Sequence, residues 1–121
     1  MIRHQHVRLS SSAFVLSILA FGCASTPAPT ELLEARSAYI RAESGIAAQY
    51  KPDQLHEAKV ALDRAEKAYA DSPSKQSTRD LAYVAERRAE LAEVQARDAK
   101  AAQDKAKAEQ DLQRATQTQL A

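Results

Sequence analysis

The chain has 121 residues, a formal net charge of +1, 45% hydrophobic and 27% charged residues, and a single cysteine. This length is enough for one small domain. The balanced charge, with no basic stripe, argues against nucleic-acid binding, and one cysteine cannot form an internal disulfide.

The N-terminal segment has the order of a secretory signal. Arg3 and Arg8 give it a positive start, and Leu9–Phe21 is an uncharged apolar run. A membrane-spanning helix needs about 20 apolar residues, so this run is too short to remain as an anchor. A positive start followed by an apolar run and small residues predicts a cleaved signal peptide over residues 1–22.

Cys23 follows this segment directly. A lone cysteine after Gly22 resembles a bacterial lipoprotein processing site, although Ala20 stands where leucine is usual. The resemblance implies that Cys23 is lipidated, with palmitate among its acyl chains, and that it becomes the first mature residue. Several acyl chains hold a protein firmly, because each buried methylene contributes about 0.8 kcal/mol. A plain signal peptide beside a coincidental cysteine is the alternative.

Ala24 bears on the compartment. By analogy with enteric lipoprotein sorting, its place after Cys23 implies a lipid-anchored protein of the outer membrane that faces the periplasm. Residues 23–30 then form a short lipidated tether, which Pro27 and Pro29 stiffen.

The first helix is predicted over Glu31 to about Tyr50, with Thr30 as its N-cap. Steps of three and four residues give it one apolar face, formed by Leu32, Ala35, Tyr39, Ala42 and Ile46, which Leu33, Ile40 and Ala47 widen. Gly45 weakens this helix and is expected to allow close approach of another helix.

The second helix is predicted from Pro52 or Asp53 to Ala70, since proline is tolerated in a first turn. Its apolar positions are Leu55, Ala58, Leu62, Ala65 and Tyr69. An ion pair is expected between Asp63 and Lys67. The turn at residues 71–74 is short, so the next helix should be an antiparallel neighbour.

The third helix is long, from Ser74 or Ser77 to about Gln117, and Ser77 with Asp80 resembles a capping box. Its first half is expected to turn one apolar face to the core, formed by Leu81, Val84, Leu91 and Val94. A second stripe of small residues follows Ala85, Ala89, Ala92, Ala96, Ala99 and Ala106. We therefore predict a helical domain over residues 31–94 and an Ala/Gln/Lys-rich helical arm over residues 95–121.

These elements predict an all-α fold, either an antiparallel helical hairpin or a three-helix unit, with a long C-terminal helix. Large apolar residues are few for the length of chain to be ordered. Domains this lean are marginal alone, so we expect self-association or a partner.

A family resemblance rests on two alanine-rich helices joined by Tyr50-Lys51-Pro52-Asp53-Gln54-Leu55. Over residues 35–101 the chain resembles DUF4398, a helical domain of unknown function found in Gram-negative envelope lipoproteins. The family often stands ahead of an OmpA-like peptidoglycan-binding domain, which implies an OmpA-like protein as a partner. No OmpA-like domain is present in the sequence up to Ala121.

Candidates for chemistry are few. His56 has no accompanying ligand or nucleophile at a suitable spacing, and an exposed helix histidine is the favoured interpretation. Glu86 and Glu90 share a helix face with Arg87 and Arg88 among them, which indicates a solvated surface. We expect no catalytic residues, no metal, no cofactor and no small-molecule substrate.

Three functions follow in order of preference. The first is a non-enzymatic, lipid-anchored scaffold that acts through helix–helix contacts with itself or an envelope protein. The second is an accessory subunit of a periplasmic enzyme or exporter that docks through the alanine stripe. The third is a catalytic protein that uses His56.

Overall fold

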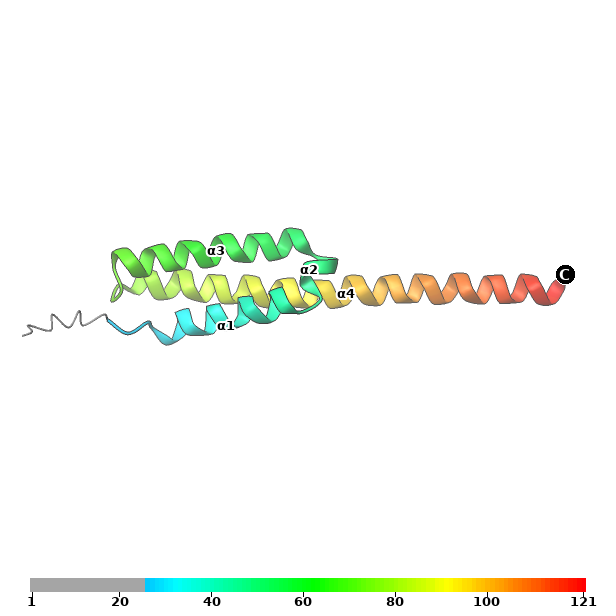
Figure 1. Ribbon diagram of the computed structural model, residues 1–121, viewed down its shortest axis with the longest axis horizontal. Helices are drawn as coiled ribbons and strands as arrows, with labels where there is room; N and C mark the ends of the chain where they lie inside the picture. The colour runs from blue at the N-terminus through cyan, green and yellow to red at the C-terminus, as the bar shows by residue number, and fades with distance from the viewer. Residues whose placement is uncertain (1–25) are drawn as a thin grey trace, which may run out of the picture.

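The computed structural model describes residues 26–121, and Cys23 with the predicted signal peptide lies outside them (Figure 1). Four helices follow one another along the chain: α1 (Thr30–Ser44), α2 (Ala47–Tyr50), α3 (Pro52–Asp71) and α4 (Gln76–Leu120). No strand occurs among the described residues. The all-α prediction is confirmed, and of its two forms the structure has the three-helix unit with a long C-terminal helix.

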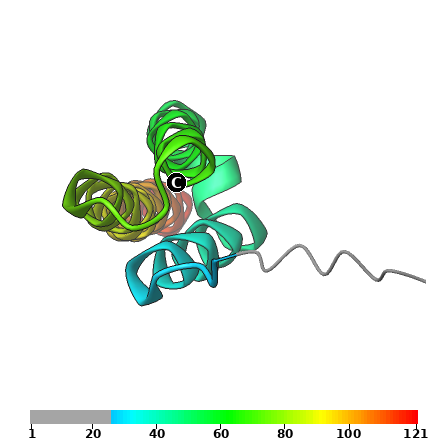
Figure 2. The ribbon, with the colours of Figure 1, turned by 90° about the vertical axis from the view of Figure 1, so that its left-hand side faces the viewer.

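The three longer helices pack around a common axis, and α2 forms a single turn between α1 and α3 (Figure 2). Helix α3 runs antiparallel to both α1 and α4 (Figure 1). Helix α4 packs against both of the others more extensively than they pack against each other. The long C-terminal helix α4 therefore makes most of the interhelical contacts of the bundle.

Gly45 explains why α1 and α2 are separate. The predicted continuous helix over residues 31–50 is wrong at this point, because α1 ends at Ser44 and α2 begins at Ala47. A Cβ at Gly45 would lie 2.9 Å from the Arg41 carbonyl oxygen, too close for a side chain. Gly45 is exposed, so it ends a helix here and does not bring two helices together.

Both predicted N-caps are wrong. Thr30 and Ser77 lie inside their helices, and the residues at the cap positions are Pro29 and Lys75. The Pro29 carbonyl accepts hydrogen bonds from the backbone N–H groups of the next turn. Neither cap residue has a side-chain oxygen, and neither helix start has a side-chain cap hydrogen bond.

The turn between α3 and α4 is fixed by Thr78, the one fully buried polar side chain in the described part of the chain. Its hydroxyl donates a 2.8 Å hydrogen bond to the carbonyl of Ser72. A buried hydroxyl needs such a partner, because an unsatisfied one costs about 1–3 kcal/mol. Pro52 opens α3 as predicted.

The core is built almost entirely from alanine. The buried hydrophobic residues of the described chain are Leu32, Ala35, Ala38, Ala42, Ala47, Ala58, Ala61, Leu62, Ala65, Ala82, Ala85, Ala89, Ala92 and Ala96. The distance between packed helices depends on the side chains at their contact, so alanine lets α4 lie close to both neighbours.

This arrangement reverses the predicted orientation of α4. The large residues expected in the core are exposed: Leu81 by 36%, Val84 by 46%, Leu91 by 48% and Val94 by 48%. The alanine stripe takes their place inside the bundle. In this bundle α4 presents its alanine face to α1 and α3, and its larger apolar side chains remain on its outer side.

The arm of α4 leaves the bundle as a continuation of the same helix (Figure 1). Ala96 is the last buried residue, and every residue over 101–121 is exposed. At 1.5 Å per residue, α4 is about 67 Å long. Within residues 26–121 no helix combines the length and hydropathy that a membrane span requires.

Candidate functional site

The most distinctive surface of the protein is the outer side of α4. In addition to the residues named above, Tyr83 is 53% exposed and Leu112 on the arm is 69% exposed. Helix α1 adds Leu33 at 50% and Ile40 at 62%. Apolar patches on a soluble surface mark contact sites for other molecules, so α4 is the first candidate for a functional surface.

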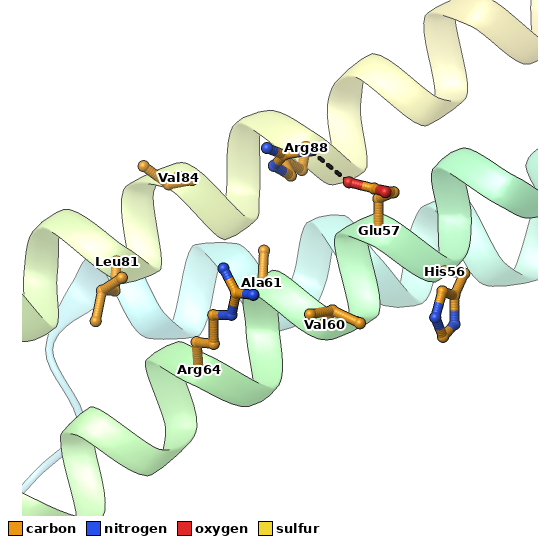
Figure 3. Close-up of a pocket in the computed structure, with 8 residues that line it drawn as sticks. All are labelled: His56, Glu57, Val60, Ala61, Arg64, Leu81, Val84 and Arg88. Atoms are coloured by element: carbon orange, nitrogen blue, oxygen red, sulfur yellow. Dashed lines mark hydrogen bonds and ion pairs between the residues drawn. The ribbon is translucent and has the colours of Figure 1, made fainter.

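A groove of about 220 Å³ lies along one edge of this surface, between α3 and α4. It is lined by His56, Glu57, Val60, Ala61, Arg64, Leu81, Val84 and Arg88 (Figure 3). Its apolar members come from both helices, and its charged members stand beside them. Such a groove suits the side of another helix better than a small polar ligand.

One ion pair joins the two helices that form the groove. Arg88 Nη1 of α4 lies 2.8 Å from Glu57 Oε2 of α3, and Figure 3 shows the two side chains directed toward each other. Both side chains are about half exposed, at 49% and 59%. Exposed pairs contribute about 0–1 kcal/mol, so this one adds little to the stability of the fold. Its main effect is to hold the Arg88 and Glu57 side chains in place beside the groove.

His56 lies at the end of the groove and points away from the Arg88–Glu57 pair (Figure 3). The groove lining contains no serine, threonine, cysteine or tyrosine within the described chain. Residues 26–121 also hold no cluster of three His, Cys, Asp or Glu side chains suited to a metal ion. Among residues 26–121, the groove therefore brings no hydroxyl or thiol nucleophile to His56 and no set of three metal-binding side chains.

Glu93 forms a second polar contact, which the sequence analysis missed. Its Oε2 lies 2.9 Å from Arg97 Nη2 on the same helix, and its Oε1 lies 3.7 Å from Arg41 Nε on α1. The Oε1 atom is buried and accepts no hydrogen bond, so the Arg41 contact is an ion pair only. Its role is to hold the end of α1 against α4.

Arg36 and Glu66 tie α1 to α3 by two parallel hydrogen bonds of 2.6 and 2.7 Å. Hydrogen bonding to Arg36 lowers the pKa of the Glu66 carboxyl, and the same bonds raise the pKa of Arg36. The predicted pair of Asp63 with Lys67 is wrong, because Asp63 bonds instead to Lys59 one turn earlier.

Tyr39, Tyr50 and Tyr69 are partly buried and pack beside the core, whereas Tyr83 is 53% exposed. The Tyr69 hydroxyl donates a hydrogen bond to the carbonyl of Thr26. That bond fixes the start of the described chain against the far end of α3.

The alanine stripe is not a free docking face. Ala85, Ala89, Ala92 and Ala96 are buried within the bundle, so no partner can reach them without separating the helices. Ala106, further along the stripe, lies on the exposed arm. The prediction that an accessory role would use this stripe is therefore wrong for its bundle part.

Comparisons with known proteins identify the family of the chain. A family model described as Domain of unknown function (DUF4398) matches residues 30–108. Searches of the curated proteins and of the solved structures found no significant match. The matched range covers all of α1, α2 and α3 and continues along α4 through the bundle into the arm, as far as Ala108. The chain therefore belongs to the DUF4398 family.

Proposed function

We propose that this protein is a non-enzymatic scaffold of the bacterial cell envelope, which is held at a membrane by lipid on Cys23 and makes contacts through the outer side of α4. One observation carries the contact function: alanine fills the core, while Val84, Leu91 and Val94 are each about half exposed. Large apolar side chains that remain exposed on the surface favour a role in binding another protein.

The arm supports the same proposal. It extends α4 beyond the bundle and has no other part of the described chain to cover it. Exposed ion pairs along it, such as Lys100 with Asp104 and Lys105 with Glu109, support the helix in water. A helix of this kind presents a long, straight contact surface to a partner.

The anchoring part rests on the sequence around Cys23. The positive start, the short apolar run and Gly22 are the features of a lipoprotein signal. We place the protein at the outer membrane, facing the periplasm, on the strength of Ala24. An OmpA-like protein is a partner that the family resemblance suggests.

Replacement of Cys23 tests the anchor. In Cys23→Ala, labelled palmitate should not enter the protein, the signal segment should remain, and the processed membrane-bound form should disappear from cell fractions. A matched change at Ser25→Ala, two residues further on, should leave labelling and processing unchanged. Normal processing and membrane association of Cys23→Ala would refute the anchor.

The groove between α3 and α4 favours a second candidate, an accessory subunit for a periplasmic enzyme or exporter. Val60, Leu81 and Val84 offer apolar contact there, and Arg64 adds a positive charge. In a pull-down, Val60→Glu should remove one specific protein under this alternative. Recovery of the same proteins with Val60→Glu and with the unchanged chain would favour the scaffold.

A further inference from the structure

Helix α4 carries four of its exposed large apolar residues, Val84, Leu91, Val94 and Leu112, in a seven-residue repeat that continues from the bundle into the arm, whereas Leu81, Tyr83 and Leu120 lie outside the repeat. One position of the repeat holds Val84, Leu91 and Leu112. Three residues after this position, the repeat holds Val94, Ala101, Ala108 and Ala115, all exposed. A heptad repeat of apolar residues with this spacing is the pattern of paired helices.

We propose that this face pairs two copies of the chain, antiparallel and side by side along α4. The inference rests on the proposed function, because it names the partner of the same surface. The pairing is symmetric, so every contact made by one copy is repeated by the other.

The face is open to a second helix along its whole length. At 3.6 residues per turn, Leu91 and Val94 lie about 150° around the α4 axis from the buried Ala89, Ala92 and Ala96. Helices α1 and α3 occupy the buried side, as the end view shows (Figure 2). A second α4 can therefore approach without displacing either of them.

Charged residues within the repeat select the orientation. Arg87, Asp98 and Lys105 occupy apolar positions of the heptad. In a parallel, in-register pair each of them lies beside its own copy, which sets three layers of like charge along the axis of the pair. Such layers are unfavourable. The antiparallel register described below separates Arg87 and Lys105 from their own copies and keeps only the two Asp98 side chains near each other.

One antiparallel register sets apolar side chains beside each other in two layers, Val84 with Ala115 and Leu91 with Ala108. Its other layers set Asp98, Lys105 and Arg87 beside the apolar residues Ala101, Val94 and Leu112. It places Leu91 beside Ala108 of the second copy and Leu112 between Val84 and Leu91 of the second copy. Its twofold axis passes close to Ala99, near the middle of α4. Each arm, exposed in the single chain, then lies along the bundle of the other copy.

The same register pairs opposite charges on both flanks. Arg88 faces Glu109 of the second copy, and Arg97 faces Asp104 of the second copy, each twice by symmetry. Both arginines are about half exposed or more, at 49% and 64%, and remain free to share a second carboxylate. A shift by one heptad in either direction instead sets Arg97 against Arg97 or Asp104 against Asp104.

On the flanks of this register, the like-charged pair is Glu90 with Asp111 of the second copy. Each of these carboxylates already has an arginine on its own helix. Arg87 lies 2.5 Å from Glu90, and Arg114 lies 2.6 Å from Asp111. These partners reduce the repulsion, so the charge pattern as a whole favours this register over its neighbours.

Cysteine cross-linking of the full chain tests the pairing in cells. Two differently tagged copies are co-expressed, one with Leu91→Cys and the other with Ala108→Cys, and treated with a short thiol cross-linker. We expect a cross-linked pair that contains both tags. The matched control Lys107→Cys is adjacent in sequence but lies on the other side of the arm, and it should not cross-link to Leu91→Cys.

Cys23 is present in every copy, so co-expressed chains without introduced cysteines measure its background. Strong cross-linking of Leu91→Cys to itself would show a parallel pair and overturn the proposal. Equal yields with Lys107→Cys and Ala108→Cys would also overturn it. If Leu91→Cys joins a different envelope protein and no second copy, self-pairing is wrong and the proposed function stands.

Charge reversal tests the register. Arg97→Glu places like charges opposite each other twice and should weaken association about tenfold. Adding Asp104→Arg to the same chain restores opposite charges and should recover the cross-link between positions 91 and 108. Failure of the double variant to recover it would overturn this register.

Discussion

At the scale of the residue, the Arg36–Glu66 pair is the best-defined polar contact of the fold. Its two hydrogen bonds join α1 to α3, which otherwise contact each other least among the three long helices. The side chains are 38% and 35% exposed, so solvent screens the pair and its contribution is about 0.5–1 kcal/mol.

The pair makes stability depend on pH. Because Arg36 lowers the pKa of Glu66 below its ordinary value of 4.5, the stabilisation is present above that value and is lost as the pH falls through the folded-state pKa. Glu66→Gln should lower the free energy of unfolding at neutral pH by about 0.5–1 kcal/mol. In denaturant titrations, the difference from the unchanged chain should shrink in acid.

Glu109→Gln on the exposed arm is the control, and it should change stability little at any pH because its contact with Lys105 is 3.9 Å long and exposed. A Glu66→Gln effect that stays constant from neutral to acid pH would contradict this account of the pair.

At the scale of the element, the sequence predicted helices well and their faces less well. The bounds of α3 agree within a residue, since Pro52 starts the helix and the turn residues end it. The interpretation of Gly45 failed because glycine is compatible with a helix contact and with a helix end alike. The structure distinguishes the two, because a Cβ atom at Gly45 would lie 2.9 Å from the carbonyl oxygen of Arg41, which indicates a helix end.

The orientation of α4 could not be read from hydrophobicity alone. Its large and small apolar residues fall on two different faces, and a larger residue contributes more on burial. That argument favoured Leu91 and Val94 for the core. The structure buries Ala89 and Ala92 instead, because α4 lies between two close helices. The number and spacing of neighbours, which the local sequence does not state, determine which face is buried.

Substitutions two residues apart on α4 test this inversion. Ala89 is fully buried, so Ala89→Leu should overpack the bundle and lower the free energy of unfolding by about 1–3 kcal/mol. Leu91 is 48% exposed, so Leu91→Ala should change it by no more than about 0.5 kcal/mol at low protein concentration. Chemical denaturation followed by circular dichroism measures both.

The reverse order of effects, with Leu91→Ala the more damaging at high dilution, would place Leu91 in the core and contradict the packing described here. At high protein concentration Leu91→Ala is expected to lower stability as well, because association of two copies stabilises the folded state.

At the scale of the whole molecule, the predicted anchor, the alanine core and the outer face of α4 have complementary roles. The predicted lipid on Cys23 would hold the start of the chain, the alanine core lets three helices lie close together, and α4 extends an apolar outer face past the bundle. The family resemblance predicted from residues 35–101 is confirmed, and the family model extends it to residues 30–108. The partner and the compartment stay predictions.

Photo-cross-linking in intact cells tests the central claim, that the outer face of α4 is where this protein contacts another protein. A photoreactive amino acid is placed at Leu91 in one full chain and at Lys107, on the other side of the same helix, in another. After irradiation, we predict protein adducts from position 91 and none above background from position 107. Adducts from position 107 with none from position 91 would contradict the claim.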